Sequence, residues 1–153
     1  MSARATALVL VTVLVLALLC GCAEVKITHP LGKQIMLEID DAQCTLGTAA
    51  LRLMEAKEEY QNSEDHVLWI RNIGDITLAE YVKDTVKDEI FRYTAAQVMA
   101  RDLTVFITDE ERSQAEQDAR NLLNELEIRY NLSKYNISTK DAVDLFLKRI
   151  YYN

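Results

Sequence analysis

Apolar residues recur every three or four positions through most of the second half of the chain, which is the period of an amphipathic helix. Three separate stripes have this spacing: Leu78, Val82, Val86, Ile90, Tyr93, Ala96, Met99 and Leu103; Ala115, Ala119, Leu122, Leu126 and Tyr130; and Ala142, Leu145, Phe146, Ile150 and Tyr151. Mostly polar and charged residues fill the positions between them. The pattern predicts three helices whose apolar faces share one core.

Each stripe is preceded by a sequence that caps a helix. In a capping box, a Ser or Thr hydroxyl accepts a hydrogen bond from the third helical N–H, and an acidic residue at that position reaches back to the N–H of the cap. The pairs are Thr77 with Glu80, Thr108 with Glu111, and Ser138 with Asp141, the last with the shorter aspartate. Each cap stabilises its helix by about 1 kcal/mol and predicts where that helix starts.

The first half of the chain predicts a hairpin followed by another helix. Residues 34–39 (QIMLEI) indicate a short strand, residues 40–41 a turn, and residues 42–44 a returning strand. A lone hairpin is marginally stable in water, so this one is expected to pack on helices. Thr45 is predicted to start the helix, although Gly47 weakens its first turn. The apolar face of that helix is expected to hold Leu46, Ala50, Leu53, Met54 and Tyr60.

Three connections complete the predicted fold. Gly74 and Asp75 indicate a turn ahead of the first capped helix. Residues 103–107 (LTVFI) and residues 131–137 link the later helices and contain apolar side chains. We expect both of these links to fold back onto the bundle, because that would bury their apolar residues.

The chain begins with a positively charged start and a long apolar run. Arg4 and the amino terminus precede residues 5–19, which are apolar apart from two threonines. This is the layout of a secretory signal peptide. The alternative is a membrane-spanning helix, which needs roughly 20 apolar residues. Residues 5–23 only just reach that length, and only if the cysteines are counted.

The residues that follow favour a lipoprotein signal. The sequence Leu19-Cys20-Gly21-Cys22 resembles the bacterial lipobox, in which a small residue precedes the cysteine that receives the lipid. Cys22 fits as the acceptor because Gly21 precedes it, whereas Cys20 follows the bulky Leu19. An uncleaved anchor is the alternative, and it would leave the protein on the same face of the membrane.

The lipobox divides the chain into three predicted parts. They are a signal peptide (1–21), a tether (22–33) and one folded domain (34–153). Acyl chains on Cys22 would hold the protein at the extracytoplasmic face of the bacterial cell membrane, because each buried CH₂ contributes about 0.8 kcal/mol. The acidic retention residue of some lipoproteins is missing, since Ala23 follows the cysteine.

The composition favours one fold class and argues against two kinds of partner. One proline and four glycines in 153 residues favour long helices over a turn-rich β fold. The net charge is −7, and loss of Arg4 with the leader makes it −8. This acidity argues against nucleic-acid binding, which needs a basic face, and against lying flat on anionic lipid.

The residues that carry metal or nucleophilic chemistry are few. Once Cys20 is removed and Cys22 is acylated, Cys44 is alone, and it is interpreted as a small packed residue rather than a nucleophile. His29 and His66 are far apart and lie in no ligand-spaced cluster, so neither a metal nor a cofactor is predicted. The sequence has no G-x-S-x-G and no glycine-rich phosphate loop. The chain as given is therefore not expected to be an enzyme.

The order of these elements resembles one family. The segment EIDDAQCTLGTAALRLMEAKEEY (38–60) is similar to the opening of the SurA/PrsA-type foldase lipoproteins, where a strand, a turn and "CTL" lead into the first helix. Residues 74–86 resemble their G-x-T-L-x-E-x-V-K-x-x-V. Residues from Met99 through ITDEE resemble A-x-x-x-G-[IV]-x-[LV]-[ST]-x-E-E. Two turn glycines of the family are replaced, one by Asp40 and one near Asp102, and Asp tolerates such backbone angles better than most residues.

The resemblance covers residues 34–152 and implies both a fold and a function. The expected fold is a mostly α, SurA N-like helical domain with a short N-terminal β-hairpin. Family members are extracytoplasmic chaperones that help secreted proteins to fold. Most carry a parvulin peptidyl-prolyl isomerase domain, which would begin near residues 149–153, so the isomerase centre has no counterpart in this sequence.

Three functions follow from this resemblance. The first is a membrane-anchored chaperone that binds unfolded or newly exported polypeptides through apolar residues not used by the core. The candidate client-binding residues are Tyr60, Trp69, Phe91 and Tyr152, and burial of each is the alternative. The second is a structural or adaptor lipoprotein that forms a homodimer or binds one partner. The third is the N-terminal part of a truncated peptidyl-prolyl isomerase.

Overall fold

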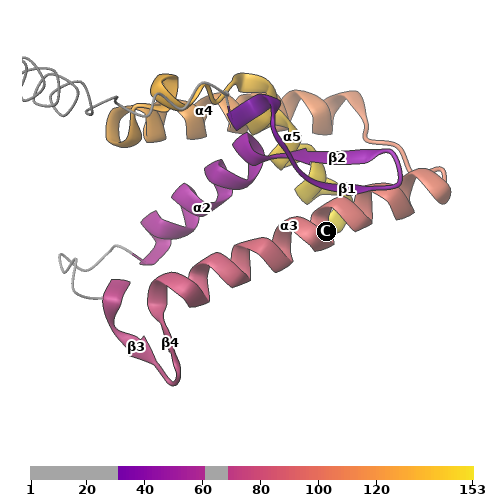
Figure 1. Cartoon of the computed structure of the whole chain (residues 1–153). Coiled ribbons are helices and arrows are strands. Elements are labelled where there is room, and N and C mark those ends of the chain that lie inside the picture. Colours follow the sequence, from indigo (N-terminus) through magenta and orange to yellow (C-terminus); the bar gives the residue numbers. More distant parts are fainter. Residues whose placement is uncertain (1–30, 61–68) are drawn as a thin grey trace, which may run out of the picture.

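A computed structural model describes residues 31–60 and 69–153. This part of the chain is mostly helical with a short N-terminal β-hairpin, as the sequence predicts (Figure 1). No helix within the described ranges has the length and apolar character needed to cross a membrane. The predicted signal peptide, the lipid acceptor Cys22, most of the tether and His66 lie outside the described residues.

The N-terminal hairpin follows a single 3₁₀ turn, η1 (Leu31–Lys33). Strands β1 (Ile35–Ile39) and β2 (Ala42–Thr45) pair antiparallel, with Leu37 opposite Cys44 and Ile39 opposite Ala42. Asp40 takes a φ of 52° in the turn, as expected for an aspartate in a glycine position. Ala42 and Cys44 are buried while the intervening Gln43 is exposed, so one face of β2 packs on the helices.

Helix α2 (Leu46–Tyr60) follows β2 without a loop. The predicted start at Thr45 was one residue early, because Thr45 still pairs with Ile35 in the hairpin. The predicted apolar face was partly misplaced. Ala50 and Met54 pack against the core as expected, but Leu53 and Tyr60 are 40% and 42% exposed, and the helix buries Leu51, Arg52 and Ala56 instead. The polar Arg52 is buried because it bonds to carboxylates, which an apolar pattern cannot indicate.

The three capped helices begin where the sequence predicts. A two-residue hairpin, β3 (Asn72–Ile73) and β4 (Ile76–Thr77), turns at Gly74 with a φ of 66° and leads into α3 (Leu78–Asp102). Helix α4 (Asp109–Tyr130) and helix α5 (Thr139–Tyr152) follow. Both halves of every capping box are present, including the box with the shorter Asp141.

Helix α5 lies at the centre of the domain and packs against α2, α3 and α4 (Figure 1). The core is built from buried residues of all four helices together with Cys44 of the hairpin. Its largest fully buried apolar side chains are Leu51, Val82, Ile90, Leu126 and Leu145. The predicted stripes of α4 and α5 and the first half of the α3 stripe therefore contribute to one core, as expected.

The end of the α3 stripe was predicted wrongly. Tyr93 packs against the core as expected, but Met99 and Leu103 are 62% and 70% exposed, and the helix buries Thr94, Val98 and Ala100 instead. The buried positions of α3 from Leu78 to Val98 are spaced by four residues, and such a series shifts gradually around a helix with 3.6 residues per turn. The elements that contact α3 change along the helix accordingly. Arg52 of α2 reaches Glu89, whereas the hairpin turn pairs with Arg101 near the helix end.

The two links between the later helices behave differently. Residues 131–137 contain a 3₁₀ turn, η3 (Leu132–Tyr135), and fold back as predicted, with Leu132 and Ile137 only 2% and 9% exposed. The link at 103–107 does not fold back, since Val105 and Phe106 are 53% and 78% exposed. Only Ile107 is half-buried. The prediction for this link was wrong because the end of α3 turns the chain outward.

Candidate functional site

Four exposed apolar residues lie close together along the chain, where α3 ends and the chain turns towards α4. We call them the junction patch: Met99, Leu103, Val105 and Phe106. Met99 and Leu103 are four residues apart and lie on the same side of the helix end. Scattered exposed apolar residues are normal, but a group of this kind is typical of an interaction surface.

The backbone that follows α3 explains why the junction patch is exposed. Thr104 takes a left-handed φ of 58°. Its N–H donates to the carbonyl of Arg101 at 3.0 Å, and the N–H of Val105 donates to the carbonyl of Ala100 at 2.8 Å. These two bonds form a Schellman motif, which ends the helix and redirects the chain. Four residues later Thr108 caps α4, so the short link is fixed at both ends.

Charged groups border the junction patch. Arg101 forms ion pairs with Asp41 of the hairpin turn and, at 3.1 Å, with Asp102. The first turn of α4 adds three carboxylates, residues 109–111. The backbone N–H of Thr108 lowers the pKa of Glu111 by hydrogen bonding to its carboxylate, which therefore stays ionised at neutral pH. The surroundings of the patch are predominantly acidic.

A second group of exposed apolar residues lies at the other end of α3. We call it the tip patch: Ile70, Ile73, Ile76 and Tyr81, which are 75%, 50%, 39% and 44% exposed. The β3–β4 hairpin carries its two central residues, and the N–H of Leu78 donates to the carbonyl of Arg71 at 2.9 Å. This hairpin projects from the start of α3, far from the junction patch (Figure 1).

One residue of each patch lies on the same side of α3. Tyr81 and Met99 are 18 positions apart, which is five full helical turns, so their side chains leave the helix in nearly the same direction. The separation along the axis is about 27 Å at 1.5 Å per residue. An extended polypeptide covers that distance with about eight residues. Between the patches the same side is polar, with Asp88 and Arg92 both exposed.

The four residues proposed from sequence as client contacts lie on different elements. Tyr60 ends α2, Phe91 is in the middle of α3 and 54% exposed, and Tyr152 is in the last turn of α5 and 47% exposed. Tyr152 meets Tyr93 edge to face, with 5.2 Å between ring centroids. Trp69 is half-buried against the core. No ring contact joins these four within the described ranges.

Sequence reasoning missed the two patches as candidate surfaces. Their signal was present in the run LTVFI (103–107) and in the isoleucines around Gly74. Both runs were assigned to connections, and a connection can either cover the core or project from it. The periodicity of the helices carries no information about that choice.

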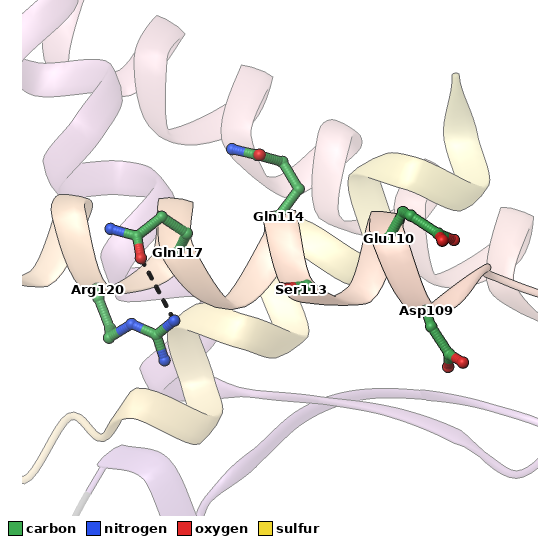
Figure 2. A pocket seen from close by; sticks show the side chains of 6 residues that line it. All are labelled: Asp109, Glu110, Ser113, Gln114, Gln117 and Arg120. Carbon is green, nitrogen blue, oxygen red and sulfur yellow. Dashed lines mark hydrogen bonds between the residues drawn. The ribbon is translucent and has the colours of Figure 1, made fainter.

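The surface formed by α4 and α5 has two hollows. The first, which we call the α4–α5 groove, has a volume of about 300 Å³ and is lined mainly by Glu111, Ala115, Asp118, Phe146, Arg149 and Ile150. The second is lined by α4 alone, and Figure 2 shows that its side chains point away from the helix without converging on a common centre. Its one internal hydrogen bond runs from Arg120 to Gln117 at 3.4 Å. Of these two hollows, the α4–α5 groove is the one lined by two helices.

A buried polar cluster links the hairpin to α5. The ammonium of Lys148, 1% exposed, donates to the carbonyl of Gln43 at 2.9 Å and to Asp144 at 2.5 Å. The hydroxyl of Thr48 donates to Asp144 at 3.1 Å, and that of Thr45 to Asp141 at 2.6 Å. These groups satisfy one another inside the domain, so the cluster holds elements together and offers no free group to a ligand.

The chemistry of the remaining candidate groups is limited. Cys44 is fully buried, and desolvation raises the pKa of its thiol to about 12, so it is a packed residue with little nucleophilic character. Within residues 31–60 and 69–153, no group of three or more His, Cys, Asp or Glu side chains has the arrangement of a metal site.

Comparison with known proteins found no family model, no curated protein and no solved structure that matches this chain.

Proposed function

We propose that this chain is a membrane-anchored, extracytoplasmic chaperone of the SurA/PrsA type that binds unfolded exported polypeptides. The observation that supports the proposal most strongly is the pair of exposed apolar patches at the two ends of α3. The core closes without them, since residues such as Phe106 and Ile70 are more than 70% exposed. Unfolded chains expose apolar side chains, and two patches about 27 Å apart would contact one extended segment at two points.

The conformation of Thr104 supports the family resemblance. Aligned from Ala100, the pattern A-x-x-x-G-[IV]-x-[LV]-[ST]-x-E-E places its glycine at Thr104 and its Ser or Thr at Thr108. Thr104 has the left-handed φ that favours glycine, and Thr108 is the N-cap of α4. On this alignment the family glycine corresponds to Thr104, two residues after the position near Asp102 that the sequence alone indicated.

Suppression of aggregation tests the chaperone proposal. The protein at several-fold molar excess over an unfolded client should reduce light scattering, and Leu103→Ser/Phe106→Ser should reduce that effect by half or more. The matched control is Ile128→Ser, because Ile128 is 88% exposed but lies near the far end of α4. The proposal fails if the wild-type protein suppresses nothing. A single stoichiometric partner captured from detergent extract would favour the adaptor function instead.

The anchor and the proposed lack of isomerase activity are tested separately. Mass spectrometry of the wild type should find the lipid on Cys22, and Cys22→Ser should abolish lipidation and leave the leader uncleaved. An unmodified Cys22 in the processed protein would refute the anchor. We also expect no acceleration of proline-limited refolding, and clear acceleration would overturn the assignment of this chain as a non-enzyme.

A further inference from the structure

The α4–α5 groove combines an apolar floor with an acidic rim. Ala115 is 1% exposed, and the half-buried side chains of Phe146 and Ile150 face the groove from α5. Its volume of about 300 Å³ is at the lower limit of small-molecule sites. That size suits one or two side chains of a bound peptide rather than a folded partner.

The carboxylates at the rim have no cationic partner within the described part of the chain. Asp118 accepts a hydrogen bond from the neutral amide of Gln114 at 2.9 Å, and Glu111 is held by the backbone and hydroxyl of Thr108. Neither forms an ion pair there. Hydrogen bonds from neutral donors orient a carboxylate but leave its charge uncompensated.

The one cation that lines the groove is already balanced. The guanidinium of Arg149 pairs with Glu55 of α2 and lies 5.2 Å from the ring centroid of Phe146. Its charge is therefore directed at α2 and does not neutralise the rim. Asp109 and Glu110 precede Glu111 and add two more carboxylates to the first turn of α4.

We propose that the α4–α5 groove binds a peptide segment in which an apolar side chain stands beside a lysine or arginine. The apolar side chain would pack on Phe146 and Ile150, and the cation would lie between Glu111 and Asp118. This inference rests on the proposed function and gives it a specificity: among unfolded segments of equal hydrophobicity, the chain selects the cationic ones. Charge complementarity of this kind selects partners and speeds their encounter.

Two peptides that differ only in charge test the selection. Both carry the same Leu and Phe residues, one with lysines and one with glutamates, and each is titrated by fluorescence anisotropy against the full chain. The protein is held in nanodiscs of zwitterionic lipid, and empty nanodiscs measure binding to the lipid. We expect the lysine peptide to bind about tenfold more tightly at low salt, with a smaller ratio at about 0.5 M salt because the charges are screened.

A pair of variants separates the groove from the general acidity of the protein. Asp118→Asn keeps the shape and the bond to Gln114, and it should reduce the preference for lysine by about threefold or more. Glu127→Gln removes the same charge from an exposed site near the far end of α4 and should leave the preference unchanged. The inference is overturned if the two peptides bind equally, if the glutamate peptide binds better, or if Asp118→Asn and Glu127→Gln have the same effect.

The aggregation assay on the same preparation keeps the two proposals distinct. Suppression of aggregation without a charge preference overturns the groove and leaves the chaperone function standing. Lysine preference that depends on Asp118, in a protein that suppresses no aggregation, supports the groove as a peptide site and overturns the chaperone function alone.

Discussion

Replacement of the buried Lys148 by methionine should destabilise the domain strongly. Methionine keeps most of the apolar stem and removes the ammonium, which bonds to Gln43 at 2.9 Å and to Asp144 at 2.5 Å. Hydrogen bonds that involve a charged group contribute about 1.5–3 kcal/mol each, and a buried carbonyl left unpaired costs about 1–3 kcal/mol. The loss of stability should be smaller than the sum of these values. Asp144 loses its cationic partner, but its side chain is 28% exposed and still accepts a hydrogen bond from Thr48.

The expected loss is about 3 kcal/mol, which lies at the lower end of the effects measured when a buried ion pair is broken. For a domain of this size it lowers Tm by about 10 °C. Thermal unfolding followed by circular dichroism measures the shift. Lys140→Met is the control, since Lys140 is exposed on the same helix and its replacement should change the free energy of unfolding by less than about 0.5 kcal/mol.

A double-mutant cycle with Asp144→Asn tests the reason for the effect. If Lys148 and Asp144 stabilise the domain as a pair, the double variant should be less destabilised than the sum of the single variants by about 1 kcal/mol or more. Additive effects would mean that the two groups act independently. A Lys148→Met variant as stable as the Lys140→Met control would refute the argument that the cluster fastens the hairpin to α5.

Three further predictions concern the turns, the caps and the thiol. Thr104→Gly should stabilise the fold by about 0.5–1 kcal/mol, because a threonine with positive φ is strained; a loss of stability in chemical unfolding would contradict this. Backbone hydrogen bonds from Thr77 and Thr108 lower the pKa of Glu80 and Glu111. The stabilisation by these caps is therefore full above the ordinary glutamate pKa of 4.5 and is lost as pH falls through the lower, folded pKa. Glu80→Gln/Glu111→Gln should consequently lose less stability than the wild type between roughly pH 6 and pH 3 when acid unfolding is compared. Cys44 should resist a thiol reagent in the folded protein and react after denaturation, as peptide mapping would show.

The sequence predicted the features that local chemistry determines. Each capping box needs only a hydroxyl and a carboxylate three residues apart, so the starts of α3, α4 and α5 followed directly. The hairpin turn at Asp40 and the turn at Gly74 are likewise set by residues that tolerate positive φ. These elements could be placed without knowledge of what packs against them.

Features that depend on packing could not be predicted in the same way. Lys148 is buried because Asp144 and the carbonyl of Gln43, more than 100 positions away, surround it. Arg52 occupies a position on the inner side of α2 where an apolar residue would be expected. It is buried for the same reason, since its Nε forms an ion pair with Oε2 of Glu89 of α3 at 2.7 Å. A hydrophobic pattern assigns such residues to the surface, because it does not include their distant partners.

The exposed patches could not be predicted for the same reason, because an apolar pattern does not show whether a residue has a packing partner. In this domain the residues that stabilise the fold and the residues proposed to bind clients are different. A side chain such as Phe106, with 78% of its surface already in water, gains little from folding, so its loss should cost well under about 1 kcal/mol. The buried cluster around Lys148 has the opposite character, since it fastens the fold and offers no group to a client. Leu103→Ser/Phe106→Ser should therefore keep the Tm of the wild type while binding clients poorly. A parallel fall in both would show that these residues belong to the core after all, and the junction patch would no longer be a candidate binding surface.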